Sequence, residues 1–286
     1  MTMNKTSSVP PLPPTSLVLL SIGCTQLGSA LAKSLFAALS PMGVVSLRVG
    51  FAAVLLLIVW RQELVGNIRS NYGLLILFGL SLALMNLSFY MAVERIPLGI
   101  AVTLEFVGPL GVAIVNSRRL LDVLWVLLAA IGIILLAPVG GLKLDLVGVA
   151  LALVAGSFWA AYILFSAKVG QVFPGGRGLA LAMAVAAIVL LPMGVLAGGS
   201  ALLKPNVLLM GFGVAMLSSA VPYSLELEAL RFLPVRVFGV LMSLEPVAAA
   251  FMGFIVLGET LNLRAIMAIL LVSVAAAGAS RFASRD

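Results

Sequence analysis

The sequence contains no histidine, a single cysteine and few charged residues. Of its 286 residues, 9% are charged, whereas soluble domains average about 25%. The absence of histidine excludes a histidine metal site and a histidine proton relay, and the lone Cys24 excludes an intrachain disulfide. Cys24 also has no base in its sequence neighbourhood. We therefore expect no enzyme activity, no cofactor and no metal.

Apolar residues dominate the remaining composition. They make up 63% of the chain, and the mean hydropathy is +1.24. This composition predicts an all-α integral membrane protein, because lipid offers no partner for open backbone groups and a helix satisfies them internally. The net charge of +7 does not indicate a nucleic-acid partner, since no basic cluster is longer than Arg118–Arg119. We expect membrane lipid as a partner, and the sequence leaves the oligomeric state open.

Ten apolar segments have the length of a membrane-spanning helix, which needs about 20 residues. Residues 1–16, with four prolines, are predicted to form a flexible N-terminal tail, and 282–286 a short C-terminal tail. The predicted helices lie at about 17–35, 42–60, 72–93, 98–116, 122–139, 144–166, 178–198, 206–230, 235–257 and 262–280.

Basic residues between these segments predict an orientation. If the N-terminus is cytoplasmic, eleven Lys and Arg residues fall on the cytoplasmic side and five on the opposite side. This excess follows the positive-inside rule, so we expect both termini in the cytoplasm. The eleven are Lys5, Arg61, Arg69, Arg118, Arg119, Lys168, Arg177, Arg231, Arg236, Arg281 and Arg285, and the five are Lys33, Arg95, Lys143, Lys204 and Arg264.

The two halves of the chain share isolated residues at a constant offset. Each half contains five predicted crossings, an odd number, so the second half is inverted relative to the first. Inverted repeats typically place a substrate site near the midplane, between the halves. We predict repeats at 17–140 and 141–281. A shift of 137 residues relates Ser81 to Ser218, Pro97 to Pro234, Pro109 to Pro246 and Asp122 to Glu259, and a shift of 135 relates Lys33 to Lys168.

Two acidic residues lie beside prolines inside apolar segments: Glu105 in LEFVGPLGVAIV and Glu245 in LMSLEPVAAAFMGFIVLG. An acid at the middle of a membrane helix costs about 2.5–3.5 kcal/mol and is a candidate for function. Pro109 and Pro246 each remove one helical hydrogen bond and are predicted to break their helices. Pro109 frees the carbonyl of Glu105 itself, and a free carbonyl beside a carboxylate suits an ammonium group, which has three donors.

The alternative is structural: the prolines only kink the helices, and the acids pair with Arg48 or Lys33. Arg48 can also neutralise a substrate carboxylate or snorkel to the interface. Neutral polar residues in a bundle serve either a substrate or ties between helices. Our candidates for the substrate site are Arg48, Asn86, Tyr90, Glu105, Trp159, Tyr162, Tyr223, Glu226 and Glu245, with Pro109 and Pro246 as helix breaks.

Several runs carry a family resemblance. The run from Pro234 to Glu259, followed by an LxxxxAIL segment, resembles the EamA repeat of the drug/metabolite transporter superfamily. IPLGIAVTLEFVGPLGVAIVNSRR (96–119), PYSLE (222–226), FGVLMSLEP (238–246) and GSALAKSLF (28–36) resemble the bacterial exporters of threonine and homoserine within it. The resemblance implies a ten-helix inner-membrane carrier that moves amino acids outward, with threonine, homoserine and similar small neutral amino acids as the expected substrates. The inverted repeat with broken helices favours alternating access as its mechanism. The proline-rich start and the extra acid Glu228 depart from this pattern.

The residues leave other transport functions open. An exporter of other small metabolites or drugs, a channel or a facilitator would use the same kinds of side chain. Proton-coupled antiport would have to use Glu105, Glu226 or Glu245, since there is no histidine, whereas a facilitator needs no titrating group. Saturable export with exchange between substrates would separate a carrier from a channel.

Overall fold

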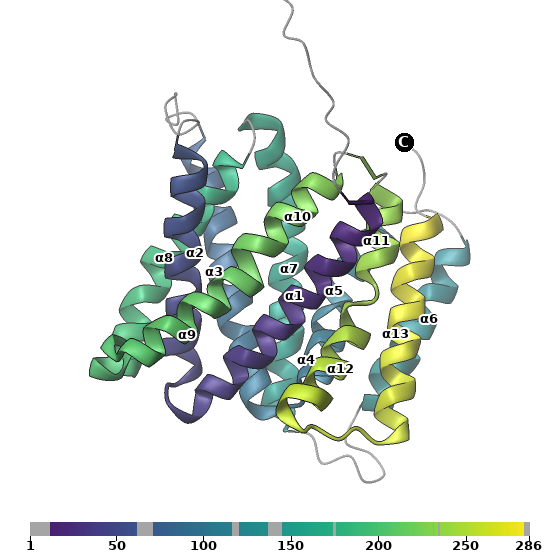
Figure 1. Ribbon diagram of the computed structural model, residues 1–286. Coiled ribbons are helices and arrows are strands. Elements are labelled where there is room, and N and C mark those ends of the chain that lie inside the picture. Colours follow the sequence, from purple (N-terminus) through teal and green to yellow (C-terminus); the bar gives the residue numbers. More distant parts are fainter. Residues whose placement is uncertain are drawn as a thin grey trace, which may run out of the picture.

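The computed structural model consists of helices and short connections (Figure 1). The predicted tails lie outside the described residues except at their inner ends, and α1 (Pro14–Ser34) begins within the first of them. No strand occurs in the part of the chain that is described. The described residues are 12–61, 71–115, 120–136, 145–173, 176–230, 232–233 and 235–282.

Helices are present at each of the ten apolar segments. In the first half, α1 is followed by a 3-10 turn, η1 (Leu35–Ala37), and α2 begins after Ser40, whose hydroxyl accepts a hydrogen bond from the amide of Gly43 at 3.3 Å and caps the helix. The other helices of this half are α2 (Pro41–Val59), α3 (Tyr72–Arg95), α4 (Leu98–Glu105), α5 (Val107–Val115) and α6 (Leu120–Leu136).

The second half contains long helices and one stretch of π-helix. Asp145 caps α7 by accepting from the amides of Val147 at 2.8 Å and Gly148 at 3.3 Å. The elements are α7 (Leu146–Val172), α8 (Arg177–Gly198), the 3-10 turn η3 (Gly199–Leu203), α9 (Pro205–Ala215), the π-helix η4 (Met216–Ala220), α10 (Val221–Leu230), α11 (Val235–Met242), α12 (Glu245–Leu257) and α13 (Leu263–Phe282).

Seven helical stretches in the described residues are long and apolar enough to cross a membrane. The other three predicted segments contain α4 with α5, α6, and α13, which give shorter apolar stretches in the described part. The seven are Pro14–Ala37, Pro41–Val59, Tyr72–Arg95, Leu146–Val172, Arg177–Leu203, Pro205–Glu226 and Val240–Leu257.

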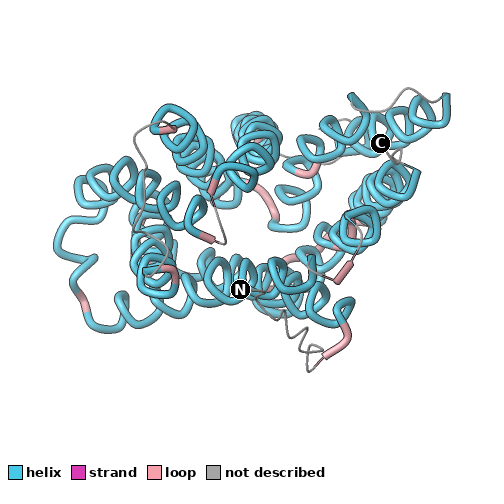
Figure 2. Tube along the Cα trace, turned by 90° about the horizontal axis from the view of Figure 1, so that it is seen from above, coloured by secondary structure: helices cyan, strands magenta, loops and turns pink. Residues whose placement is uncertain are grey.

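The bundle is elongated when it is seen along the helices (Figure 2). Helices α8 and α9 lie at one end and α6 and α13 at the other (Figure 1). Between them, α3 packs against α7 and α8, and α1 packs against α10 and α12. Many fully buried positions are alanines, such as Ala30, Ala52 and Ala83, which let helices approach closely.

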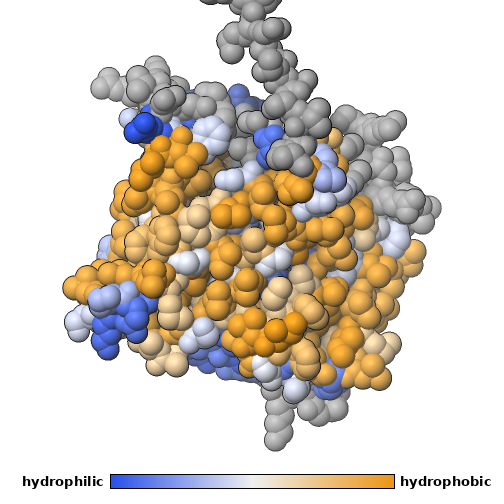
Figure 3. Space-filling view, viewed as in Figure 1, coloured by the Kyte–Doolittle hydropathy of each residue, from blue (hydrophilic) through white to orange (hydrophobic). Residues whose placement is uncertain are grey.

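The outer surface is apolar. On the face shown in Figure 3, apolar side chains cover the middle of the molecule, and hydrophilic residues gather toward the upper and lower edges. Large side chains are fully open to the surroundings, as with Leu196, which is 87% exposed. Soluble monomers rarely carry apolar surface of this extent. A lipid bilayer is the environment in which this surface is stable.

Candidate functional site

The first interrupted helix carries Glu105. Helix α4 ends at Glu105, and Phe106 separates it from α5, three residues before Pro109. The carbonyl of Glu105 lies against α7, because a Cβ added to Gly156 would be 2.6 Å from its oxygen. A Cβ on Gly108 would in turn collide with the carbonyl oxygen of Gly156. The backbones of α4 and α7 are in contact here, and the carbonyl of Glu105 lies in this contact, against Gly156.

The second interrupted helix carries Glu245 in a different position. Helix α11 ends at Met242, and α12 begins at Glu245 with Pro246 in its first turn. The N-terminus of a helix favours a carboxylate, whereas the C-terminus, where Glu105 lies in α4, disfavours one. Both side chains are buried, with 6% of Glu245 and 7% of Glu105 exposed. Two similar sequence blocks thus place their glutamates at opposite ends of a helix dipole, Glu105 at a C-terminus and Glu245 at an N-terminus.

Arg48 is buried in the bundle rather than extended to the membrane interface. Its Nε donates to the hydroxyl of Ser219 at 3.2 Å, one Nη to the hydroxyl of Tyr90 at 3.2 Å, and the other to the carbonyl of Ser218 at 3.0 Å. The guanidinium carbon lies 5.4 Å from the centroid of the Tyr90 ring. Arg48 therefore ties α2 to α3 and to η4, and it does not snorkel.

A third proline, Pro222, leaves the carbonyl that Arg48 binds without its usual helical donor. Pro222 lacks the amide that would bond the carbonyl four residues earlier, which belongs to Ser218. The chain forms the π-helix η4 just before this proline, a distortion common at functional sites. The sequence analysis missed this contact, although the proline rule applied to Glu105 also applies to Pro222.

Several predicted site residues share one electrostatic environment. The charges of Arg48 and Glu105 act on each other, and Tyr223 is subject to both and to two further glutamates. The carboxyl of Glu245 lies within electrostatic range of the carboxyl groups of Glu226 and Glu105. Tyr162 is coupled to Tyr223 and Glu226. We call this group the polar cluster: Arg48, Tyr90, Glu105, Tyr162, Tyr223, Glu226 and Glu245.

Ser21 extends the polar cluster to α1. Its hydroxyl donates to the carboxyl of Glu226 at 2.6 Å and lies 3.4 Å from the carbonyl of Pro222. The sequence analysis did not identify Ser21, Ser218 or Ser219, because isolated serines are common in membrane helices and carry no signal of their own. The Ser21 hydroxyl shows that Glu226 faces α1.

For two other candidates, no contact with the polar cluster occurs among the described residues. Asn86 donates its amide to the carbonyl of Leu82 in its own helix at 2.8 Å. The ring of Trp159 packs edge-on against Phe106, with centroids 5.3 Å apart. By contrast, Tyr162 stacks on Phe78 at 5.3 Å and still belongs to the cluster.

Comparisons with known proteins identify the family of this chain. Residues 146–281 match the model of the EamA-like transporter family. The threonine/homoserine exporter RhtA of Salmonella typhimurium strain LT2 is 41% identical over 283 residues, covering 98% of this chain and 96% of its own. RhtA of Escherichia coli strain K12 is 43% identical over 251 residues, 87% of this chain and 85% of its own.

A solved crystal structure of a protein 17% identical to this chain has the same fold, with a TM-score of 0.66 over 94% of this chain and 97% of its own. The likeness of fold therefore extends over nearly the whole chain. Because the two RhtA proteins match at more than 40% identity along most of their length, the chain belongs to the EamA-like transporter family.

Proposed function

We propose that this protein exports threonine, homoserine and similar small neutral amino acids across the bacterial inner membrane by alternating access. Relatives named for these two substrates are 41–43% identical to this chain. The observation that carries the proposal is the polar cluster, which holds one guanidinium and three carboxyl groups inside an apolar bundle. A zwitterion has the complementary charges at its two ends.

We assign the ammonium end of the substrate to Glu245 and Glu226. The charges of Glu226 and Glu105 oppose that of Glu245, so a cation there would relieve this repulsion as well as form a bond. A guanidinium has five N–H donors, of which Arg48 uses three for described partners. We assign the substrate carboxylate to the other two. Tyr162 and Tyr223 supply hydroxyls suited to a hydroxylated side chain.

We further propose ten membrane crossings arranged as two inverted repeats, residues 17–140 and 141–281. The pattern of packed helices supports this. Helix α1 packs against α10 and α12, and its counterpart α7 packs against α3, α4 and α5. Helix α2 packs on its counterpart α8, and α6 on its counterpart α13. Exchanging the two halves leaves this pattern unchanged, as a two-fold axis between them requires.

The proposed orientation has both termini in the cytoplasm. The first turn of α1 and the last turn of α13 lie at the same edge of the molecule (Figure 1). A reporter that fluoresces only in the cytoplasm should be bright when fused after Asp286 and dark when inserted after Lys143. The reverse pattern would overturn the orientation and leave the site unaffected.

Export measured with a panel of amino acids tests the substrate assignment. Cells that express the protein should tolerate toxic external threonine or homoserine better than control cells and hold less of both inside. Unchanged intracellular levels across the panel would reject amino-acid export and favour an exporter of other small metabolites. Efflux that neither saturates nor exchanges one substrate for another would favour a channel.

A further inference from the structure

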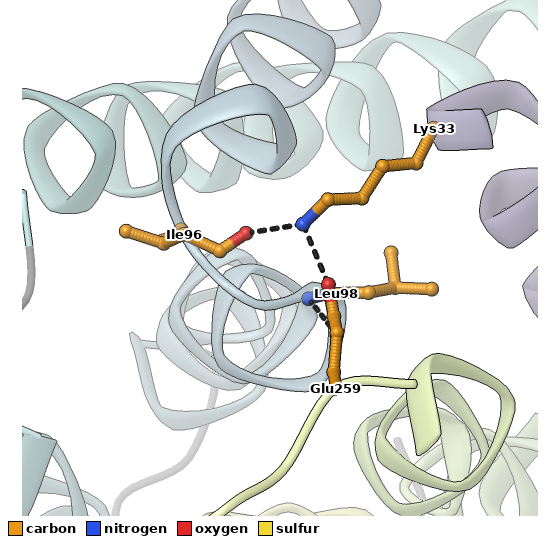
Figure 4. A network of polar contacts seen from close by, with 4 residues as sticks. All are labelled: Lys33, Ile96, Leu98 and Glu259. Carbon is orange, nitrogen blue, oxygen red and sulfur yellow. Dashed lines mark hydrogen bonds and ion pairs between the residues drawn. The ribbon is translucent and has the colours of Figure 1, made fainter. Parts of the chain in front are cut away.

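A polar network joins three segments at one edge of the molecule (Figure 4). The ammonium of Lys33, at the end of α1, donates to one carboxylate oxygen of Glu259 at 2.6 Å and to the carbonyl of Ile96 at 2.9 Å. The other oxygen of Glu259 accepts from the amide of Leu98 at 2.9 Å. Lys33 is twelve residues from Ser21 of the cluster, about 18 Å along the helix. The network therefore lies at the end of the bundle, not in the polar cluster.

The local sequence places the carboxylate of Glu259 at the N-terminus of α4. Gly258 ends α12 with a φ of 66°, a left-handed conformation that suits glycine, and the amide of Glu259 then bonds the carbonyl of Gly253 at 3.0 Å. Leu98 provides the first amide of α4, just after Pro97. An anion is favoured at such a helix N-terminus, so the carboxylate binds Lys33 and caps α4 together.

The two interrupted helices are packed together at this edge and not at the other. A Cβ added to Gly99 of α4 would lie 2.7 Å from the Cα of Ala250 in α12. At the opposite ends of the same helices, α5 and α11 show no comparable packing within the described residues. The network thus lies where the space between the two halves is closed.

The repeat places a matching set of residues at the opposite edge. Lys168 corresponds to Lys33, Asp122 to Glu259, and Pro234 to Pro97. Helix α11 begins at Val235, directly after its proline, as α4 begins directly after Pro97. Lys168 is exposed and forms no ion pair with any described residue. The components of a second network are therefore present in the sequence, and the side chain of Asp122 lies outside the described residues.

We propose that the network of Lys33, Ile96, Leu98 and Glu259 locks one end of the transport path in this conformation, and that Lys168 and Asp122 lock the other end in the alternative conformation. This inference rests on the proposed alternating access. In an inverted repeat the halves exchange roles when the carrier changes state, so a contact that closes one end has a counterpart that closes the other. The two locks exclude each other, because the substrate site opens to one side at a time.

A second ion pair at the same edge provides a matched control. Arg95 and Asp145 approach to 3.0 Å and join α3 to α7. Their side chains are 39% and 36% exposed, compared with 20% for Lys33 and 14% for Glu259. Arg95–Asp145 joins two helices that pack closely elsewhere, so its loss leaves the closed end closed.

Thiol labelling of the full-length protein in membranes tests the locks. In a Cys24→Ser background, Gln26→Cys provides the reporter, since Gln26 is buried on the face of α1 that carries Lys33, about two turns deeper. A membrane-impermeant maleimide is applied from the Lys33 side. We expect Glu259→Gln to raise the labelling rate about tenfold, which corresponds to about 1.4 kcal/mol. Lys33→Met should have the same effect.

Loss of the counterpart lock should change the labelling rate in the opposite direction. Asp122→Asn should lower labelling from the Lys33 side, whereas Asp145→Asn should leave the rate unchanged. Unchanged labelling in both Glu259→Gln and Lys33→Met, or faster labelling in Asp122→Asn, would overturn the proposal. The measurement needs no substrate, so a failure to export threonine would reject the proposed function without affecting this result.

Discussion

The two interrupted helices are alike in sequence and differ in what lies against them. At the break between α4 and α5, the backbone of Glu105 touches Gly156 of α7. The position in α1 related to Gly156 by the 135-residue shift is Ser21, whose hydroxyl bonds Glu226 near the break between α11 and α12. One break is closed by backbone packing, and the other faces a hydroxyl and a second acid.

The difference assigns separate tasks to the two glutamates. Arg48 provides an opposite charge near Glu105, whereas the charges of Glu226 and Glu105 oppose that of Glu245. We therefore expect Glu105 to hold Arg48 and the bundle in place, and Glu245 to receive the substrate ammonium. Each of the following predictions tests this division.

The largest effect is expected for Glu245→Gln. The substitution keeps size and hydrogen bonding but removes the charge, and a hydrogen bond to a charged group contributes about 1.5–3 kcal/mol. Threonine efflux should fall about tenfold or more at unchanged membrane abundance, because neutralising a buried acid lowers the cost of insertion. Glu228→Gln, in the half-buried last part of α10, is the control and should export normally. Normal efflux by Glu245→Gln would remove the acid from the site.

Gly156→Ala should disturb only the interruption between α4 and α5, where the backbone of α7 is packed against it. The new methyl group would lie 2.6 Å from the carbonyl oxygen of Glu105, a backbone atom that no rotamer change can move. We expect a loss of about 1–3 kcal/mol in the free energy of unfolding, seen as a lower Tm in detergent. Gly170→Ala in the same helix meets no atom within 4 Å and should not lower the Tm. Equal Tm values for the two variants would contradict the close contact.

A double-mutant cycle measures how far Arg48 and Glu105 depend on each other. We expect Glu105→Gln and Arg48→Met together to destabilise the protein by less than the sum of the single changes, with a coupling of about 1 kcal/mol, since groups in one polar network couple by roughly 0.5–3 kcal/mol. Additive losses of stability, combined with an export defect in Glu105→Gln as large as that of Glu245→Gln, would show that Glu105 also serves the substrate.

The smallest effect is expected at the exposed ion pair of Arg95, the last residue of α3, and Asp145, the residue before α7. The hydrogen bond from Arg95 lowers the pKa of Asp145. The ion pair's contribution to stability is thus fully present above the pKa that Asp145 has in the unfolded chain. It is lost as the pH falls through the lower pKa that Asp145 has in the folded protein. Asp145→Asn keeps the helix cap and removes the charge, and because an exposed ion pair contributes little, the Tm near pH 7 should fall only slightly. A large fall in Tm would show that this pair, like Arg48 and Glu105, carries part of the fold.

Composition made the helices predictable, because an apolar segment in lipid has few alternatives to a helix. Helices lie at all ten predicted segments, and the interruptions occur within three residues of Pro109 and Pro246. The orientation and the inverted repeat remain predictions. They depend on which side of the membrane each loop faces, which the packing of helices alone does not determine.

The site was predictable in its charged members and its three tyrosines, but not in its serines. Arg48, Glu105, Glu226 and Glu245 are conspicuous in an apolar chain, but their pairing depends on contacts between residues far apart in sequence. Lys33 was a possible partner for the intramembrane acids, and the structure pairs it with Glu259 instead. That choice depends on the left-handed turn at Gly258, whose direction cannot be inferred from residue spacing.

Exchange by purified protein in liposomes tests the central claim most directly. Liposomes loaded with unlabelled threonine should take up labelled threonine through the wild-type protein in a saturable manner that homoserine inhibits. Glu245→Gln, reconstituted at the same density, should lose most of this exchange, and Glu228→Gln should retain it. Absence of exchange by the wild-type protein, or full exchange by Glu245→Gln, would contradict an amino-acid carrier whose substrate ammonium binds at Glu245.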